Sequence, residues 1–184
     1  MATCSLLGVI IERVAYKRLR KSTRIAALTT AIGVSLFIEY VVIYFRGAQL
    51  ESYPKDVLPQ TNIDIFGATV SSQSLWILIV TILLMILLQL IVHRTKIGKA
   101  MRAVSIDHDT ARLMGINVDN TISATFAIGS ALAGAAGVIF GIYYTRIDPL
   151  MGIIPGLKAF IAAVLGGIGL IPGAMVGGFL LGIV

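Results

Sequence analysis

The chain has 184 residues, of which 57% are hydrophobic and only 13% are charged, and its mean hydropathy is +0.93. Soluble domains carry about 25% charged residues, so this composition excludes a soluble globular domain and predicts an integral membrane protein. The net charge of +6 does not indicate nucleic-acid binding, because the basic residues adjoin apolar runs and are not interleaved with stacking aromatic side chains.

The Lys and Arg residues fall into four blocks, which predict the topology. Eleven of the fifteen lie in residues 12–24 and 93–120. Because such residues concentrate in cytoplasmic loops, these two loops are predicted to be cytoplasmic, and the loops 46–73 and 146–156 external. The fold is therefore predicted to be an all-α polytopic bundle forming one transmembrane domain. Its helices are expected at about 1–11, 25–45, 74–92, 121–145 and 157–184.

The apolar residues 1–11 are too few to cross a membrane, since about 1.5 Å per residue covers only half of a bilayer. They lack the features of a signal peptide, so they are interpreted as the inner half of a helix whose start is missing. The chain is accordingly expected to be a fragment of a longer protein. Residues 12–24 are expected to form a basic connection at the headgroup level of the membrane lipid.

The run 25–45 contains one formal charge, Glu39. An ionisable group inside a membrane costs about 2.5 to 3.5 kcal/mol on insertion scales, so Glu39 should face protein or water. It is either a polar contact in a permeation path or a residue near the external end that reaches the interface or a neighbouring helix. In the following loop, the alternating residues 62–70 predict a short hairpin about Gly67, and the bulky run 75–92 predicts a lipid-facing helix.

The loop 93–120 contains a predicted short helix from Ser105 to Met114. Ser105 and Asp107 can accept hydrogen bonds from its first turn, and Gly115 can end it in the left-handed conformation. One side of this helix and the residues after it are apolar, which suits docking into a groove on a partner. The alternative is an ordinary solvated loop. The apolar residues are Ala111, Met114, Ile116 and Val118, and the polar ones are Asp107, Asp109 and Arg112.

The run 122–145 is rich in Gly and Ala. The spacing of Ala133, Gly137 and Gly141 gives a face of small residues that allows close contact between helices in a membrane. This helix is therefore predicted to lie in the bundle interior, where it would move with the loop that precedes it.

The last run, 157–184, is interrupted by glycine and proline. Such interruptions line substrate paths in some transporters, where freed backbone groups can meet a polar solute. The alternative is a tight kink that lets helices pack. The residues of the interruption are Gly166, Gly167, Gly169, Pro172 and Gly173.

No catalytic, metal or cofactor site is expected in this chain. His93 and His108 are the only histidines, and no cysteine lies near them to complete a zinc site. No phosphate-binding G-x-x-x-x-G-K-[ST] motif is present, so the chain is not expected to hydrolyse a nucleotide itself.

Three stretches resemble the membrane subunit of the bacterial ABC importer for branched-chain amino acids, more narrowly the LivH type. They are GVIIERVAYKRLRKSTRIAALTTAIGVSLF (8–37), IGKAMRAVSIDHDTARLMGINV (97–118) and GLKAFIAAVLGGIGLIPGAMVGGFLLGIV (156–184). Import permeases of this kind carry a cytoplasmic loop with the pattern E-A-A-x-x-x-G. Residues 109–115 match it loosely: Ala111 and Gly115 fit, Asp109 replaces the acidic residue and Thr110 departs.

The resemblance implies a heteromeric importer in the bacterial inner membrane. Its expected partners are two cytoplasmic ATPase subunits that bind ATP and Mg²⁺, a second permease subunit of the LivM type and an extracytoplasmic amino-acid-binding protein. Ala111 and Gly115 would permit close approach of the ATPase, and Asp109 and Arg112 would make polar contacts at its rim. The alternatives are an ABC permease for urea or short-chain amides, a secondary amino-acid transporter coupled to an ion gradient, and a membrane scaffold.

Overall fold

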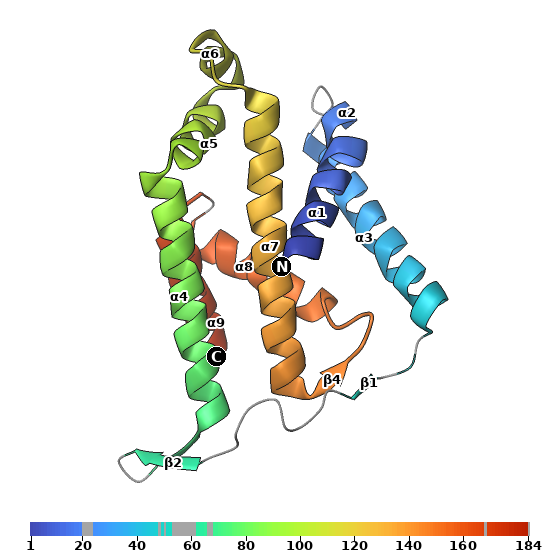
Figure 1. The fold of residues 1–184 in the computed structure, drawn as a ribbon, viewed down its shortest axis with the longest axis vertical. Coiled ribbons are helices and arrows are strands. Elements are labelled where there is room, and N and C mark those ends of the chain that lie inside the picture. Colours follow the sequence, from blue (N-terminus) through green and yellow to red (C-terminus); the bar gives the residue numbers. More distant parts are fainter. Residues whose placement is uncertain are drawn as a thin grey trace. The chain divides into compact units, whose positions relative to one another are not determined.

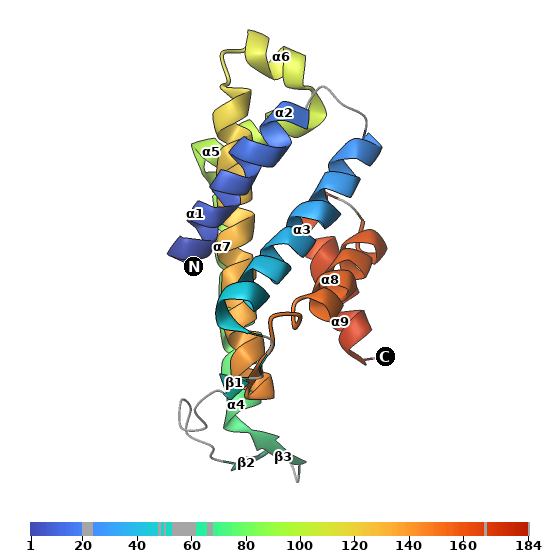
Figure 2. The same ribbon diagram turned by 90° about the vertical axis from the view of Figure 1, so that its right-hand side faces the viewer.

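The computed structural model describes residues 1–19, 24–47, 49, 51–52, 62–65, 68–167 and 169–183, most of which are helical (Figures 1 and 2). The predicted all-α fold is confirmed. The chain divides into two compact units. One comprises residues 1–38 and 52–146, and the other comprises residues 39–51 and 147–184.

Three of the described helices are long and apolar enough to cross a membrane, namely Thr29–Arg46 within α3, then α4 and α7. The strands are short: β1 (Glu51–Ser52), β2 (Asn62–Ile65), β3 (Ala68–Ser71) and β4 (Arg146–Ile147). The helical segments are α1 (Ala2–Ile11), the π-helical η1 (Glu12–Tyr16), α2 (Lys17–Leu19), α3 (Arg24–Arg46), α4 (Ser72–Arg94), α5 (Lys96–Ile106), α6 (His108–Leu113), α7 (Val118–Tyr144), α8 (Ile153–Leu165) and α9 (Ile171–Ile183).

The predicted hairpin after α3 is confirmed. Strands β2 and β3 pair antiparallel, with Asn62 opposite Ser71 and Ile65 opposite Ala68. Helix α4 follows directly and has no buried residue, as expected for a helix with bulky apolar side chains all round. The tip of the hairpin, with Gly67, lies outside the described residues.

The amino-terminal helix is longer than predicted, because η1 and α2 continue α1 without a break as far as Leu19. The expected connection 12–24 is therefore helical in its first part, where Arg, Ala, Lys and Leu are good helix formers. Helix α1 packs against α7 within the first unit (Figure 1). A Cβ atom at Gly8 would lie 2.0 Å from Ser130 Oγ, and one at Gly134 would lie 2.8 Å from Cys4 Sγ.

Helix α1 meets a face of α7 other than the one with Ala133, Gly137 and Gly141, and close helix contact at that second face stays a prediction. Ala133 is exposed, and a Cβ atom at Gly137 would meet nothing within 4 Å, although Gly141 is buried. Small residues recur along α7 at several overlapping spacings, so the sequence pattern predicts a close contact without selecting the face that makes it.

In the second unit the last apolar segment is two helices rather than one interrupted helix. Helices α8 and α9 have 13 residues each, or about 20 Å, which is shorter than the hydrocarbon core of a bilayer. They cross closely: a Cβ atom at Gly173 would lie 1.9 Å from the carbonyl oxygen of Gly166. Gly167 and Gly169 have φ of 89° and 99°, which L residues adopt only with strain, so the turn between the helices needs glycine.

Replacing Gly173 with valine is expected to separate α8 from α9 and to destabilise the protein by about 1–3 kcal/mol, as overpacking generally does. Gly182→Val is the matched control on the same helix, because a Cβ atom there would have nothing within 4 Å. The measurement is the midpoint of thermal unfolding in detergent. Equal midpoints for the two variants would contradict the close crossing.

Candidate functional site

The segment 93–120 begins with a sharp bend between α4 and α5. Thr95 ends α4 and caps α5, its hydroxyl oxygen accepting a hydrogen bond from the Gly98 N–H at 3.0 Å. Gly98 is required at the bend, since a Cβ atom would lie 2.2 Å from the carbonyl oxygen of Val92. The Arg102 guanidinium donates a hydrogen bond to that same carbonyl, so a free backbone group at the end of α4 is satisfied.

Asp107 separates α5 from α6, as its predicted role as an N-cap requires. Its carboxylate accepts hydrogen bonds from the Asp109 N–H at 2.8 Å, the Thr110 N–H at 3.3 Å and the Thr110 hydroxyl at 2.7 Å. These bonds hold the pKa of the Asp107 carboxyl below its ordinary value, and the Thr110 hydroxyl contributes most. The predicted capping by Ser105 is wrong: its hydroxyl donates to the Arg102 carbonyl oxygen within α5, a helix that the sequence pattern did not predict.

Gly115 ends α6 in the left-handed conformation, with φ of 81°, as predicted. Two backbone hydrogen bonds close the end, from the Gly115 N–H to the Arg112 carbonyl and from the Ile116 N–H to the Ala111 carbonyl, each 3.0 Å. This pair of bonds is the Schellman motif, which usually has an apolar contact across it. Ile116 and Ala111 belong to one apolar cluster and supply that contact.

Ala111 is therefore an interior residue, contrary to its predicted place on an exposed surface. It is only 4% exposed and packs with Val104 of α5 and Val118 of α7, which are 5% and 2% exposed. The helical spacing of the apolar residues was correct. It could not indicate, however, that the chain's own α5 and α7 cover that side of α6.

Three large apolar side chains of the segment are almost fully accessible: Ile106, Leu113 and Met114 are 88%, 88% and 79% exposed. We call these three residues the apolar knob. Helix α6 lies beyond the amino-terminal end of α7 in the first unit (Figures 1 and 2). Three large apolar side chains this exposed at one tip are typical of a surface that binds a partner.

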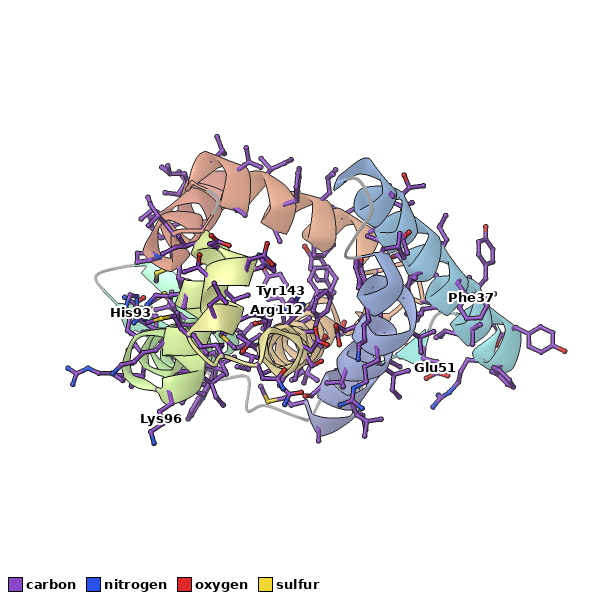
Figure 3. All side chains as sticks on the ribbon, turned by 90° about the horizontal axis from the view of Figure 1, so that it is seen from above. Phe37, Glu51, His93, Lys96, Arg112 and Tyr143 are labelled. Carbon is purple, nitrogen blue, oxygen red and sulfur yellow. The ribbon has the colours of Figure 1, made fainter. Side chains whose placement is uncertain are left out.

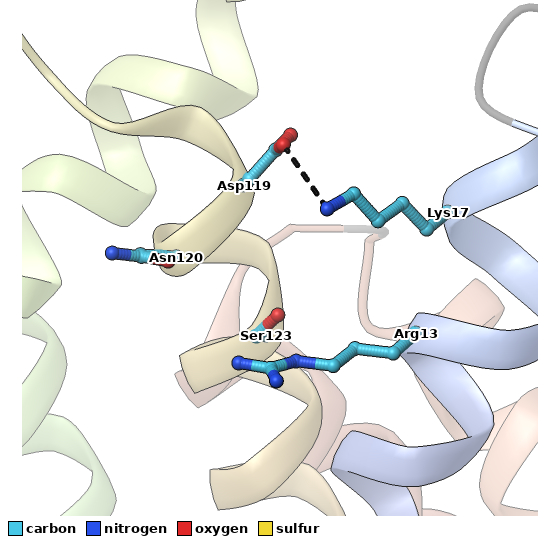
Figure 4. Close-up of a pocket in the computed structure, with 5 residues that line it drawn as sticks. All are labelled: Arg13, Lys17, Asp119, Asn120 and Ser123. Atoms are coloured by element: carbon cyan, nitrogen blue, oxygen red, sulfur yellow. Dashed lines mark ion pairs between the residues drawn. The ribbon is translucent and has the colours of Figure 1, made fainter.

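Charged residues join α6 to its neighbours. Arg112 lies beside α7, whereas Lys96 points outward (Figure 3). Asp119, in the first turn of α7, lies 4.0 Å from the Arg112 guanidinium and 3.7 Å from Lys17 Nζ of α2 (Figure 4). The side chains are about half exposed, so each ion pair adds little stability, but one carboxylate links three helices.

Glu12, at the start of the predicted connection 12–24, is fully buried. The Ser123 hydroxyl of α7 donates a hydrogen bond to its carboxylate at 2.6 Å. The signal in the sequence was a lone acidic residue at the end of an apolar helix within a basic block. Such a group must find hydrogen-bond donors when the helix packs.

The predicted pathway residues belong to the second unit. Glu39 is half-buried on α3 and has an interaction within the chain. The glycines 166, 167, 169 and 173 form the turn and crossing of α8 and α9, and Pro172 stands in the first turn of α9. Their contacts match the packing alternative, and a role in a solute path stays a prediction. No group of three or more His, Cys, Asp or Glu side chains in the described part of the chain could hold a metal ion.

Helices long and apolar enough to cross a membrane, together with highly exposed apolar side chains at α6, are typical of a membrane protein. The family model described as "Branched-chain amino acid transport system / permease component" matches residues 1–184. The chain belongs to this family of transport permeases. No solved structure matches it.

Known relatives are similar along almost the whole chain. It is 43% identical to the high-affinity branched-chain amino acid transport system permease protein LivH of Escherichia coli K12 over 182 residues, and 43% identical to BraD of Pseudomonas aeruginosa over 183 residues. Each match covers 97% of this chain and 59% of the relative, so the chain spans about three fifths of their length. The nucleoside ABC transporter permease protein NupB of Lactococcus lactis is 22% identical over 76% of the chain.

Replacing Gly115 with valine is expected to loosen the end of α6, because a β-branched residue in the left-handed region costs about 1–2 kcal/mol. Gly115→Asn should keep the motif, since asparagine tolerates this conformation. Hydrogen exchange at the Gly115 and Ile116 amide positions measures the effect: exchange should accelerate in the valine variant alone. Unchanged protection with valine would rule out the need for a left-handed residue.

Proposed function

We propose that this chain is a membrane-spanning permease subunit of an ATP-driven importer that moves leucine, isoleucine or valine across the bacterial inner membrane. The observation that carries the proposal is the 43% identity to LivH and BraD over 97% of the chain, since both names specify branched-chain amino acid transport. The spanning helices α3, α4 and α7 supply the scaffold that such a subunit needs.

The proposed energy source lies in other polypeptides. Two cytoplasmic ATPase subunits would bind ATP and Mg²⁺, a second permease subunit of the LivM type would pair with this chain, and an external binding protein would deliver the amino acid. The apolar knob fits the ATPase contact, because large exposed apolar side chains are the usual anchors of a protein interface. Asp109 and Arg112 are exposed beside it and would form the polar rim.

A displacement of the knob would be passed on through rigid contacts. The buried cluster of Val104, Ala111 and Val118 attaches α6 to α5 and to the start of α7. Asp119 joins the same region to α2 through Lys17. In this proposal the ATPase pushes on Leu113 and Met114, and α7 tilts with them while α1 follows through its close contacts at Gly8 and Gly134.

The second candidate function is import of a different solute, a nucleoside. The similarity to NupB, which is a nucleoside permease by name, supports this candidate. Both candidate functions require the same membrane-spanning helices and the same ATPase subunits. They differ only in the transported solute.

Uptake by the assembled importer in proteoliposomes tests the function. Labelled leucine should accumulate only when ATP and the binding protein are present, and excess isoleucine or valine should compete, whereas nucleosides and urea should not. Uptake driven by an ion gradient without ATP would contradict the proposal, and competition by a nucleoside would support the second candidate.

The double variant Leu113→Ser, Met114→Ser is expected to weaken ATPase binding at least about tenfold, since each buried anchor at an interface contributes more than about 1 kcal/mol. Ile97→Ser is the control, because Ile97 is a half-exposed apolar residue of α5 outside the knob. The measurements are co-purification of the ATPase subunits and ATP hydrolysis stimulated by the binding protein. Wild-type values in the double variant would show that the knob is not the contact.

A further inference from the structure

A pocket of about 250 Å³ lies within the first unit, between η1 with α2 on one side and the first turns of α7 on the other (Figure 4). None of the residues that line it is apolar. They are Arg13, Lys17, Asp119, Asn120 and Ser123.

The lining has an excess of positive charge, because two cations face one carboxylate. Lys17 pairs with Asp119 at 3.7 Å, and Asp119 is also shared with Arg112. Arg13 extends toward Ser123 in the pocket (Figure 4), and within the described part of the chain it has no hydrogen bond or ion pair. The Ser123 hydroxyl donates its proton to the buried Glu12 carboxylate. It is uncharged, so it does not neutralise the Arg13 guanidinium.

The helix that supplies these cations is apolar in its earlier turns. Ile10 and Leu6 lie about one and two turns before Arg13 and are 51% and 65% exposed, because α7 covers the opposite side of α1, at Cys4 and Gly8. The same helical segment carries Tyr16, whose ring packs on Phe126 with centroids 5.1 Å apart. Tyrosine is enriched where a membrane meets water.

We propose that this pocket binds the phosphate group of an anionic phospholipid. The guanidinium of Arg13 and the ammonium of Lys17 hold the phosphate oxygens, and an acyl chain lies along Ile10 and Leu6. Guanidinium groups bind phosphate through paired hydrogen bonds, and basic pockets between helices at the cytoplasmic side of a membrane hold lipid headgroups. When the phosphate is bound, the ion pair between Asp119 and Lys17 weakens, and the ion pair between Asp119 and Arg112 remains.

The test uses the protein purified in its native assembly in a zwitterionic detergent. Native mass spectrometry counts the retained phosphatidylglycerol and phosphatidylcholine, and inorganic phosphate is added in a separate arm. The test variant is the double substitution R13Q/K17Q. The control is K96Q/K99Q, which removes two exposed cations of α5 away from the pocket. The variant Arg13→Lys retains the positive charge. This variant and the midpoint of thermal unfolding without added lipid distinguish a loss of lipid binding from a loss of folding.

Wild type and the control are expected to retain phosphatidylglycerol over phosphatidylcholine, and R13Q/K17Q to bind it roughly tenfold more weakly, since each basic residue near an anionic headgroup contributes several-fold. Arg13→Lys should lose less. Equal retention of the two lipids by wild type, or equal losses in the two double variants, would overturn the proposal. In the separate arm, millimolar inorganic phosphate could displace the lipid and stabilise wild type but not R13Q/K17Q. That result would show that the pocket binds free phosphate, and it would overturn the proposal of a phospholipid.

Discussion

The small size of Ala111 is the constraint on which the packing of the segment 93–120 depends. Its methyl group lies between Val104 and Val118, at the point where α5, α6 and α7 meet, and a larger side chain would have to displace one of these helices. Gly115 supplies the turn that brings Ile116 back onto the same cluster. The Ala-x-x-x-Gly part of the loop pattern thus has an explanation within the chain. The pattern builds the tip, and the neighbouring Leu113 and Met114 face outward from it.

Between the apolar helices, packing depends on the close approach of their backbones. Burial of apolar surface gives little drive for helix association in lipid, so packing and hydrogen bonds decide which helices pair. Gly8 and Gly134 allow α1 to lie directly on α7, and the Ser123 hydroxyl bonded to Glu12 adds a polar contact to the same pair. In the second unit, Gly166 and Gly173 do the same for α8 and α9. The two units therefore use one packing device at different places.

Composition and local signals predicted the class, the hairpin, the Asp107 cap and the Gly115 turn, because each depends on residues adjacent in sequence. The failures concern contacts between distant segments. Helical spacing marks Ala111 as apolar-facing but does not distinguish the chain's own helices from a partner. Small residues on α7 occur on several faces, and only the packing of α1, with Gly8 against Ser130 and Cys4 against Gly134, selects one of these faces. Helix α5 was missed because its many basic residues were counted as loop charges.

The hydrogen bond between Glu12 and Ser123 joins positions 111 residues apart in the chain. At a ribosomal rate of about 5–20 residues per second, the Glu12 carboxylate is made roughly 6–22 seconds before the Ser123 hydroxyl. During this interval the amino-terminal helix cannot complete its pairing. Biogenesis of this protein therefore includes an interval in which the amino-terminal helix exists without its contact to α7.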